Sequence, residues 1–400
     1  MSDTNRGRIA YVAESTLGTT PTDPALQILR LTSSDLAYNK ETTQSNELDS
    51  GRMLTDVPEV GASASGSLSI EYSPGSFDDL IEAALGGTRS SKVSLSGGID
   101  ITAGGAGTAT IVDGDANGAL TAAALTVGQF IFLAGFANET NNGWWQLTAR
   151  TDDDTIVVAD PSNKMVTETG GVGTKLIAQT MTNGTVERSF SFEESYLDVF
   201  MHRLFAGQRV STMGIDLSTG SIATGSFGLM GTTVSIESKS DIDPEPSWLG
   251  SGSRTAATTT KVLNATSNVG DIMIDGAVAQ ACFQSLSLNL DNTLRSLMCI
   301  GSKYPTSINY GRQTISGNIS NLFANWVLYE KMLNHEDIAL SFGLVAPGGQ
   351  GGIHFYLPRV TLSNDTVNLS GGVDSDVQES IDWSALKHAD GYQIRVDIAS

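Results

Sequence analysis

Ser65-Gly66-Ser67-Leu68-Ser69-Ile70-Glu71-Tyr72 alternates polar and apolar residues, the pattern of a β-strand with one buried and one solvated face. Ser73-Pro74-Gly75 ends this strand. Ser76 is a candidate N-cap of a following helix, Gly86 is its candidate end, and the apolar residues between them share one face: Phe77, Leu80, Ile81, Ala84 and Leu85. The stretch therefore predicts a strand followed by a short helix that lies on a sheet.

The same unit returns about 250 residues later, at 316–334. Ser316-Gly317-Asn318-Ile319-Ser320 repeats the Ser-Gly-x-apolar-Ser opening, Asn325 can cap a helix, and Asn334 can end it. The flanking segments repeat in part, because residues 27–36 match 283–290 and residues 185–193 match 338–344. A strand followed by a helix is a common pattern, so coincidence is the alternative to two tandem copies of one β fold.

Composition favours a mainly β chain and argues against nucleic-acid binding. Only 17% of the 400 residues are charged, 43 are glycine, and 44 acidic against 23 basic residues give a net charge of -21. Phosphate contacts need clustered Lys and Arg, whereas an acidic wall keeps DNA from adhering. We find no signal peptide or membrane-spanning segment, which predicts a protein made in the cytoplasm and no membrane partner. The two cysteines, Cys282 and Cys299, do not make a disulfide framework.

Shifts in composition predict the domain boundaries. Residues 1–26 look like an N-terminal arm, residues 27–92 with 177–240 like a first β-sandwich domain, and residues 280–400 like a second. Residues 93–176 read as a small β module inserted into the first domain, and residues 241–279 as a linker or extended loop. Each sandwich is expected to carry one flanking α-helix.

No constellation of residues indicates catalysis, a metal site or a cofactor. The four histidines lack metal-ligand spacing, and the sequence contains no nucleophile elbow, phosphate loop or dinucleotide fingerprint. Trp144-Trp145 could form a sugar-binding platform, and a surface adhesin or carbohydrate-binding protein is therefore the alternative function. A strand in a small barrel also needs aromatic core residues, so the pair has a structural interpretation as well.

Three segments resemble the major tail-tube proteins of bacteriophages with long, non-contractile tails. They are Arg8-Ile9-Ala10-Tyr11-Val12-Ala13-Glu14 with Leu17-Gly18-Thr19-Thr20-Pro21, the Ser65–Leu85 unit, and Leu357-Pro358-Arg359-Val360. The resemblance covers both predicted sandwich domains and leaves out the inserted module. It implies a structural virion protein without enzymatic activity, whose rings stack into the tail tube, the conduit for DNA from capsid to host cell.

The resemblance also implies partners. Family members commonly form rings of six single-domain subunits, so two domains in one chain suggest a homotrimeric ring with pseudo-sixfold symmetry. Tape-measure and tail-terminator proteins are further expected partners, and DNA is expected to pass through without specific binding.

Candidate residues follow for three surfaces. The long polar link 40–59 would contact the next ring through its carboxylates: Glu41, Glu47, Asp49, Asp56 and Glu59. The arm would brace neighbours through Arg8, Tyr11 and Glu14. Carboxylates on the polar phase of inner strands would face the channel: Glu71, Glu187 and Glu193. Solvated positions on the outer face are the alternative for these last three, because the sequence alone does not choose the phase of each strand.

Overall fold

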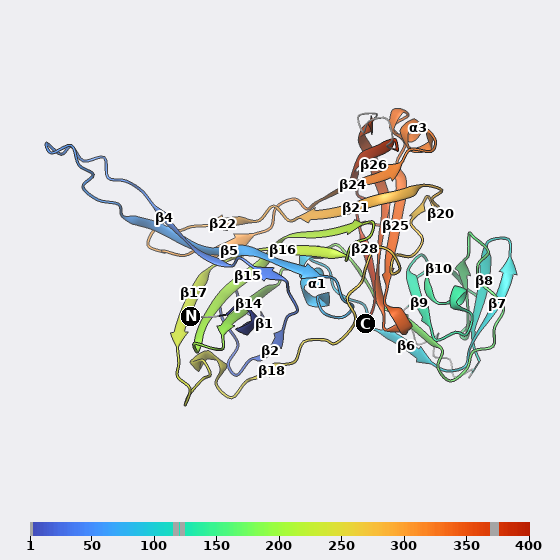
Figure 1. The fold of residues 1–400 in the computed structure, drawn as a ribbon, viewed down its shortest axis with the longest axis horizontal. Helices are drawn as coiled ribbons and strands as arrows, with labels where there is room; N and C mark the ends of the chain where they lie inside the picture. Colours follow the sequence, from blue (N-terminus) through green and yellow to red (C-terminus); the bar gives the residue numbers. More distant parts are fainter. Residues whose placement is uncertain (1–2, 115–119, 121–124, 369–375) are drawn as a thin grey trace.

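One antiparallel sheet runs without interruption through both halves of the chain (Figure 1). The computed structural model describes residues 3–114, 120, 125–368 and 376–400. Neighbouring strands of this continuous sheet are β4 (Ala37–Thr42, preceded by β3, Ser33–Ser34), β5 (Glu59–Glu71), β16 (Thr224–Gly231), β15 (Met201–Ser218), β21 (Cys282–Asp291), β24 (Thr314–Leu322), β27 (Gln378–Ala385) and β26 (Gly352–Asn368). We call the part before β21, without the inserted module, the first half, and the part from β21 onward the second half.

Each half folds a second sheet over one face of the continuous sheet. In the first half its order is β18 (Ser253–Thr255), β2 (Ala25–Ile28), β1 (Gly7–Glu14), β14 (Ser189–Tyr196), β15 and β17 (Thr233–Ser238). In the second half it is β20 (Ala277–Val278), β19 (Met273–Ile274), β25 (Ile338–Val345), β26, β28 (Arg395–Ala399) and β13 (Thr180–Thr182). Strands β13, β19 and β20 precede β21 in the chain but are counted with the second half because they pair with its strands. One apolar cluster fills the space between the layers of both halves. The predicted mainly β class, with paired sandwich units, is confirmed.

The long strands β15 and β26 play the same part in the two halves. The beginning of each pairs with the strand before it in the second sheet, β14 or β25, and its end pairs with β16 or β27 in the continuous sheet. The pairing register shifts at a bulge in both, between Val210 and Thr212 and between Ser363 and Asp365. A bulge bends a strand, which lets one strand serve two layers.

Close backbone packing explains the repeated Ser-Gly. A Cβ on Gly66 would lie 2.7 Å from the Asp35 oxygen, and one on Gly317 would lie 2.0 Å from the Ser287 oxygen and 2.4 Å from the Trp383 ring. Neither position has room for a side chain. The glycines that mark the two units in the sequence are therefore required by the strand and ring beside them.

A short helix follows the repeated strand in each half. Helix α1 (Asp78–Leu85) ends at Gly86, whose φ of 61° is left-handed. Helix α3 (Val327–Leu333) ends at Asn334, and the Asn325 side chain accepts a 3.1 Å hydrogen bond from the Val327 N–H. Ser76 does not cap α1; its hydroxyl bonds the Ser73 and Thr258 hydroxyls instead.

The predicted insert is a separate seven-stranded sheet with its own core. Its strands are β6 (Val93–Ser96), β12 (Lys175–Ala178), β9 (Phe130–Ala134), β10 (Gly143–Arg150), β11 (Thr155–Ala159), β8 (Thr108–Asp113) and β7 (Ile99–Gly105), in spatial order. Figure 1 shows this module beyond the second half, far from the β4–β5 hairpin. Although it interrupts the first half in sequence, it packs on the second half, through Phe130, Phe132 and Trp144.

Three predicted segments differ from expectation. Residues 7–14 are not an arm but strand β1, hydrogen-bonded between β14 and β2. Residues 241–279 add strands to both halves and bury Leu263 in the core, so they are not a free linker. Strand β13 pairs with β28 of the second half.

Further short elements are two strands, β22 (Arg295–Leu297) and β23 (Ser307–Asn309), and 3-10 turns at Thr4–Arg6, Glu139–Asn141, Ser247–Leu249 and Pro347–Gly349. Among the described residues, neither helix has the length and apolar character that crossing a bilayer requires.

Candidate functional site

The face of the continuous sheet that points away from the core is almost entirely small and uncharged, with a few carboxylates. Residues that pair directly across strands share a face, so the register identifies this face, which we call the polar face. On the six strands from β5 to β27, the polar face includes Ser65, Ser67, Ser69, Glu71, Thr224, Ser226, Gly228, Thr212, Gly214, Asp216, Ser218, Ser285, Ser287, Asn289, Asp291, Thr314, Ser316, Asn318, Ser320, Ser380, Asp382 and Ser384. No Lys or Arg is in this set; the register also pairs Ser65 with Met230 and Met230 with Arg209, next to the bulge of β15, and Arg209 is 9% exposed and ion-paired with Glu187.

Three carboxylates of the polar face lie in one row across the sheet. The residues directly opposite one another in this row are Glu71, Thr224, Asp216, Ser287, Asn318 and Asp382. The amide of Asn318 donates to an Asp382 carboxylate oxygen at 2.8 Å and to the Ser380 hydroxyl at 2.9 Å. The row crosses the junction between the halves, so both contribute to one acidic band.

Of the three predicted channel residues, only Glu71 lies on the polar face. Glu187 precedes β14, and its carboxylate pairs with Arg209 at 2.6 Å beside the base of the second-half hairpin. Glu193 lies on β14 and is completely buried. The interpretation of Glu187 and Glu193 as channel residues is therefore corrected. The sequence analysis did not predict Asp216, Asp291 and Asp382 on this face, although each occupies the polar position of an alternating strand, as Glu71 does.

Glu193 instead joins three segments of the first half. Its carboxylate accepts hydrogen bonds from the Arg254 guanidinium at 2.8 Å, the Trp248 indole at 3.1 Å and the Ser195 hydroxyl at 2.9 Å, and Arg8 lies 3.6 Å away. Burial alone would raise the pKa of the Glu193 carboxyl, but the hydrogen bonds and charge of Arg254 outweigh it and lower the pKa. This ion pair holds the segment around β18 against the sheet.

The other predicted arm residues are also structural. The Tyr11 side chain is buried in the core, and its hydroxyl donates a 2.9 Å hydrogen bond to Asp79 of α1. Burial, followed by the charge of Asp79, raises the Tyr11 pKa. Glu14 accepts hydrogen bonds from the hydroxyls of Ser189 and Ser191 and from the N–H groups of Gly18 and Gly207, at 2.7–2.9 Å. These contacts fasten β1 to the first half.

The predicted long link is a hairpin that extends far from the body of the protein (Figure 1). Its strands are β4 and β5, and its tip, residues 43–58, is largely exposed. Exposed apolar side chains accompany the predicted carboxylates Glu41, Glu47, Asp49, Asp56 and Glu59: Leu48, Met53, Leu54, Val57 and Val60. At the base, Glu59 pairs with Lys303 at 3.0 Å, and the hydrogen bonds from Lys303 and Tyr38 lower the pKa of Glu59.

A second hairpin occupies the same topological place in the second half. It joins β21 to β24 as the first joins β4 to β5, contains β22 and β23, and exposes Leu297, Met298 and Ile300. The N–H of Ala62 on β5 donates to the Lys303 oxygen at 2.9 Å, so the two hairpins lie side by side at their bases. The sequence analysis did not predict this hairpin, although Leu297-Met298-Cys299-Ile300 occupies the same place between two strands as the first hairpin does in the first half.

The two helices differ in how well they are covered. Helix α1 is buried along most of its length, and the second half reaches it through Asn292 and Gln313, whose amides donate to the Ala84 oxygen at 2.9 and 3.1 Å. In α3 only Leu328 is buried, while Trp326 beside it and Val327 and Leu333 within it are exposed. The apolar face of α3 is thus exposed, whereas the corresponding helix of the first half, α1, is covered.

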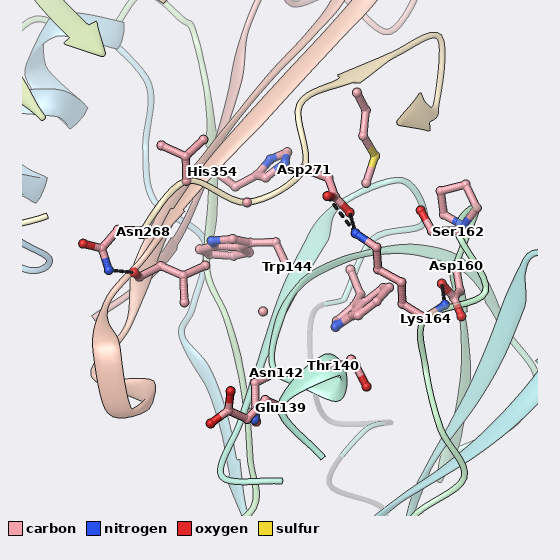
Figure 2. Close-up of a pocket in the computed structure, with 18 of the residues that line it drawn as sticks. Glu139, Thr140, Asn142, Trp144, Asp160, Ser162, Lys164, Asn268, Asp271 and His354 are labelled. Carbon is pink, nitrogen blue, oxygen red and sulfur yellow. Dashed lines mark hydrogen bonds and ion pairs between the residues drawn. The ribbon is translucent and has the colours of Figure 1, made fainter. Parts of the chain in front are cut away.

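A cavity of about 480 Å³ lies where the module meets the second half, and Figure 2 shows its lining. Trp144 and Trp145 are 9% and 8% exposed, and their indole N–H groups donate at 3.1 Å to the oxygens of Leu344 and Asn141. His354 is buried beneath Phe130, with ring centroids 3.7 Å apart, and burial, followed by the charge of Arg395, lowers its pKa. The ion pair between Lys164 and Asp271 bridges module and body at 2.6 Å.

The tryptophan pair is therefore part of a joint, and its proposed role as an exposed sugar platform is wrong. Both rings are committed to packing and to backbone oxygens, which leaves no open aromatic face of the kind a sugar stacks on.

Comparison with known proteins identifies the family of the chain. A family model described as "Phage tail tube protein" matches residues 4–385, nearly the whole chain. A search of curated proteins found no match.

Proposed function

From a chain that belongs to the phage tail tube protein family, and so is a structural component of the virion tail, we propose that three copies close into one ring with pseudo-sixfold symmetry. The observation that carries this proposal is the pairing of β15 with β21, which joins the two halves into a continuous sheet. Strand β26 corresponds to β15, and β3 with β4 corresponds to β21. The edge of β26 would therefore pair with the β3–β4 edge of the next chain.

The dimensions of such a ring suit a DNA conduit. Three chains of eight strands give 24 strands, which at roughly 4.8 Å spacing and ~40° tilt form a barrel of about 48 Å backbone diameter. A duplex about 20 Å wide passes through this bore once side chains line it. Closure also removes the two open sheet edges, which otherwise invite uncontrolled pairing.

The polar face would line the channel. Its Ser, Thr and Asn side chains offer no fixed positive charge, and the row of Glu71, Asp216 and Asp382 would place a band of carboxylates around the bore. Phosphates bind tightly where Lys and Arg displace counterions, so a wall without them lets DNA slide without specific binding. In this proposal the protein is a passive conduit without enzymatic activity.

The two hairpins would join successive rings. Both expose apolar side chains, which in a folded protein often mark an interaction surface. The first also carries the carboxylates that would fix its position on the next ring. At the ends of the tube the same tips, or the surface they would cover, would meet the tape-measure and tail-terminator proteins. The module, seated on the second sheet of the second half, would decorate the outside.

Uncovered α3 supplies the test. If the first half of the next chain covers α3 as the second half covers α1, replacing Trp326 and Leu333 by Ser should prevent ring closure without unfolding the chain, because both side chains are exposed in the monomer. Mass photometry of the wild-type chain should show particles of three 42.0 kDa chains, and negative-stain images should show rings or tubes.

The matched control is Val172→Ser, an apolar residue of the module that is also exposed. Six-chain rings would contradict the proposed stoichiometry. Normal rings from the Trp326/Leu333 variant would contradict the proposed contact.

A further inference from the structure

Beneath helix α3, three polar side chains occupy positions that are apolar in the first half. The repeated Ser-Gly aligns Asn321 of β24 with Ile70 of β5. Cross-strand register then aligns Glu379 with Gly225, and Asp365 with Met213. Ile70 is 4% and Met213 0% exposed, so the first half closes this end of its core without polar groups.

These three side chains hold oxygen atoms that no hydrogen-bond donor reaches. Glu379 is 1% and Asn321 is 3% exposed, and the Asn321 amide donates to Glu379 Oε2 at 2.8 Å. The remaining oxygens are buried and unpartnered: Glu379 Oε1, Asn321 Oδ1, and both carboxylate oxygens of Asp365. Within the described part of the chain, no Lys, Arg or His forms an ion pair with either carboxylate. Buried charges are normally paired or bound to a metal.

The two carboxyl groups are in contact with each other. Burial, followed by the charge of Glu379, raises the pKa of Asp365 to about 6. Two buried carboxyl groups thus face one another without an ion pair to any Lys, Arg or His of the described residues, an arrangement that a divalent cation would satisfy.

A cavity of about 470 Å³ gives access to this cluster. Asn321 and Glu379 line it, together with α3 and the segment 277–281. Its basic residue, Lys331, is already paired with Asp275 at 2.8 Å. The volume leaves room for water molecules beside an ion, and Ca²⁺ binds six to eight oxygens from carboxylates, amide carbonyls and water.

We propose that Asp365, Glu379 and Asn321 bind a divalent cation, with Ca²⁺ the best match to an all-oxygen set, at the base of α3. The ion would tie β24, β26 and β27 together beside the helix. This assignment concerns a single chain and is independent of ring formation.

The test uses the full chain, stripped with EDTA and dialysed at pH 7.5. Addition of CaCl₂ should raise the midpoint of thermal unfolding by about 2–5 °C, because a ligand that binds only the folded state stabilises it. Isothermal titration should give one site per chain, and MgCl₂ should act more weakly.

Variants assign the effect to this cluster. Glu379→Gln and Asp365→Asn should each abolish the response to CaCl₂, whereas Asp216→Asn, an exposed carboxylate on the corresponding strand β15, should leave it unchanged. The triple variant N321I/D365M/E379G copies the first-half residues. It should fold and remain insensitive to CaCl₂. Its folding would show that the response is lost because the ligands are absent and not because the chain misfolds.

Two results would overturn the proposal. One is the absence of any shift with CaCl₂ or MgCl₂ at pH 7.5. The other is a shift that persists in both Glu379→Gln and Asp365→Asn. A stripped chain that responds to pH alone would instead show that the two carboxyls share a proton.

Discussion

The first half buries Glu193 against a guanidinium, an indole and a hydroxyl, whereas the second half buries Glu379 with a single amide hydrogen bond and no ion pair. Glu193 meets Arg254, Trp248, Ser195 and, more distantly, Arg8. Glu379 meets one amide and another carboxyl. The halves share strand order, register and a required glycine, so the framework does not dictate either arrangement. The two halves thus share a backbone arrangement while each carries its own buried polar group.

The largest effect is expected from Glu193→Ala. Removing this carboxylate leaves the buried Arg254 guanidinium with only the half-exposed Glu245 as an ionic partner, which should lower the free energy of unfolding by about 3–5 kcal/mol. Chemical denaturation of the full chain measures this loss of unfolding free energy. Limited proteolysis detects the release of β18. Asp337→Ala, which breaks the exposed pair with Arg359, should cost at most about 1 kcal/mol. Equal losses in the two variants would remove the contrast between a buried and an exposed pair.

Trp144→Ala comes next and separates the module from the second half. The substitution removes a buried ring and the hydrogen bond to Leu344, at a cost of about 3 kcal/mol or more to the joint. We expect the module to detach while it and the body remain folded, seen as early proteolysis near residues 88–92 and 179–184. Trp145 packs in the module's own core, so Trp145→Ala should instead unfold the module. Cleavage inside the module in both variants would contradict this division.

The buried carboxyls should give opposite pH dependences. The Asp365 pKa is raised to about 6, so between its ordinary value near 4 and pH 6 the folded chain holds more protons than the unfolded one. Stability in EDTA should therefore fall as pH rises through this window. The Glu193 pKa is lowered, so its contribution is present above its ordinary value and is lost as pH falls below it.

Thermal midpoints from pH 3 to 8 measure both slopes. Asp365→Asn should flatten the slope between pH 4 and 6 only, and Glu193→Gln the slope below pH 4.5 only. If the slope of the thermal midpoint between pH 4 and 6 were unchanged in Asp365→Asn, a group other than Asp365 would cause it.

The smallest effect on folding should come from the hairpin tips. Replacing residues 44–57 by a short Gly-Ser turn removes exposed side chains only, so the free energy of unfolding should change by about 0.5 kcal/mol or less. Replacing Leu297, Met298 and Ile300 by Ser should be equally mild. Both changes should shorten or abolish tubes in negative-stain images while rings still form. A variant that lost its cooperative transition would show that the tip belongs to the folding unit.

Much of the framework was predictable because alternation and glycine spacing report local geometry. Both repeated units, the inserted module and Glu71 were located in this way. Residues 7–14 were misread as an arm because the strand is short and buries residues on both faces: Ile9 and Tyr11 on one, Ala10 on the other.

The errors at Glu193 and at the cation cluster have a different cause. Glu193 occupies the polar phase of its strand, as predicted, but residues 245–254 cover that phase, and its partner Arg254 lies 61 positions away in sequence. Asp365 meets Glu379 only through a bulge that shifts the register of β26. Alternation shows which residues share a face of a strand, whereas segments distant in sequence decide whether that face is exposed to solvent.

The junction between β15 and β21 also bears on how quickly a tube can start. In the proposed ring, half of the contacts between neighbouring units form inside single chains, before any two molecules meet. Nucleation of a ring then depends on the third power of protein concentration instead of the sixth. Fusion of two units thus lowers the concentration at which closed rings outcompete open fragments, and it fixes an alternating order of unlike units around the ring without any recognition step.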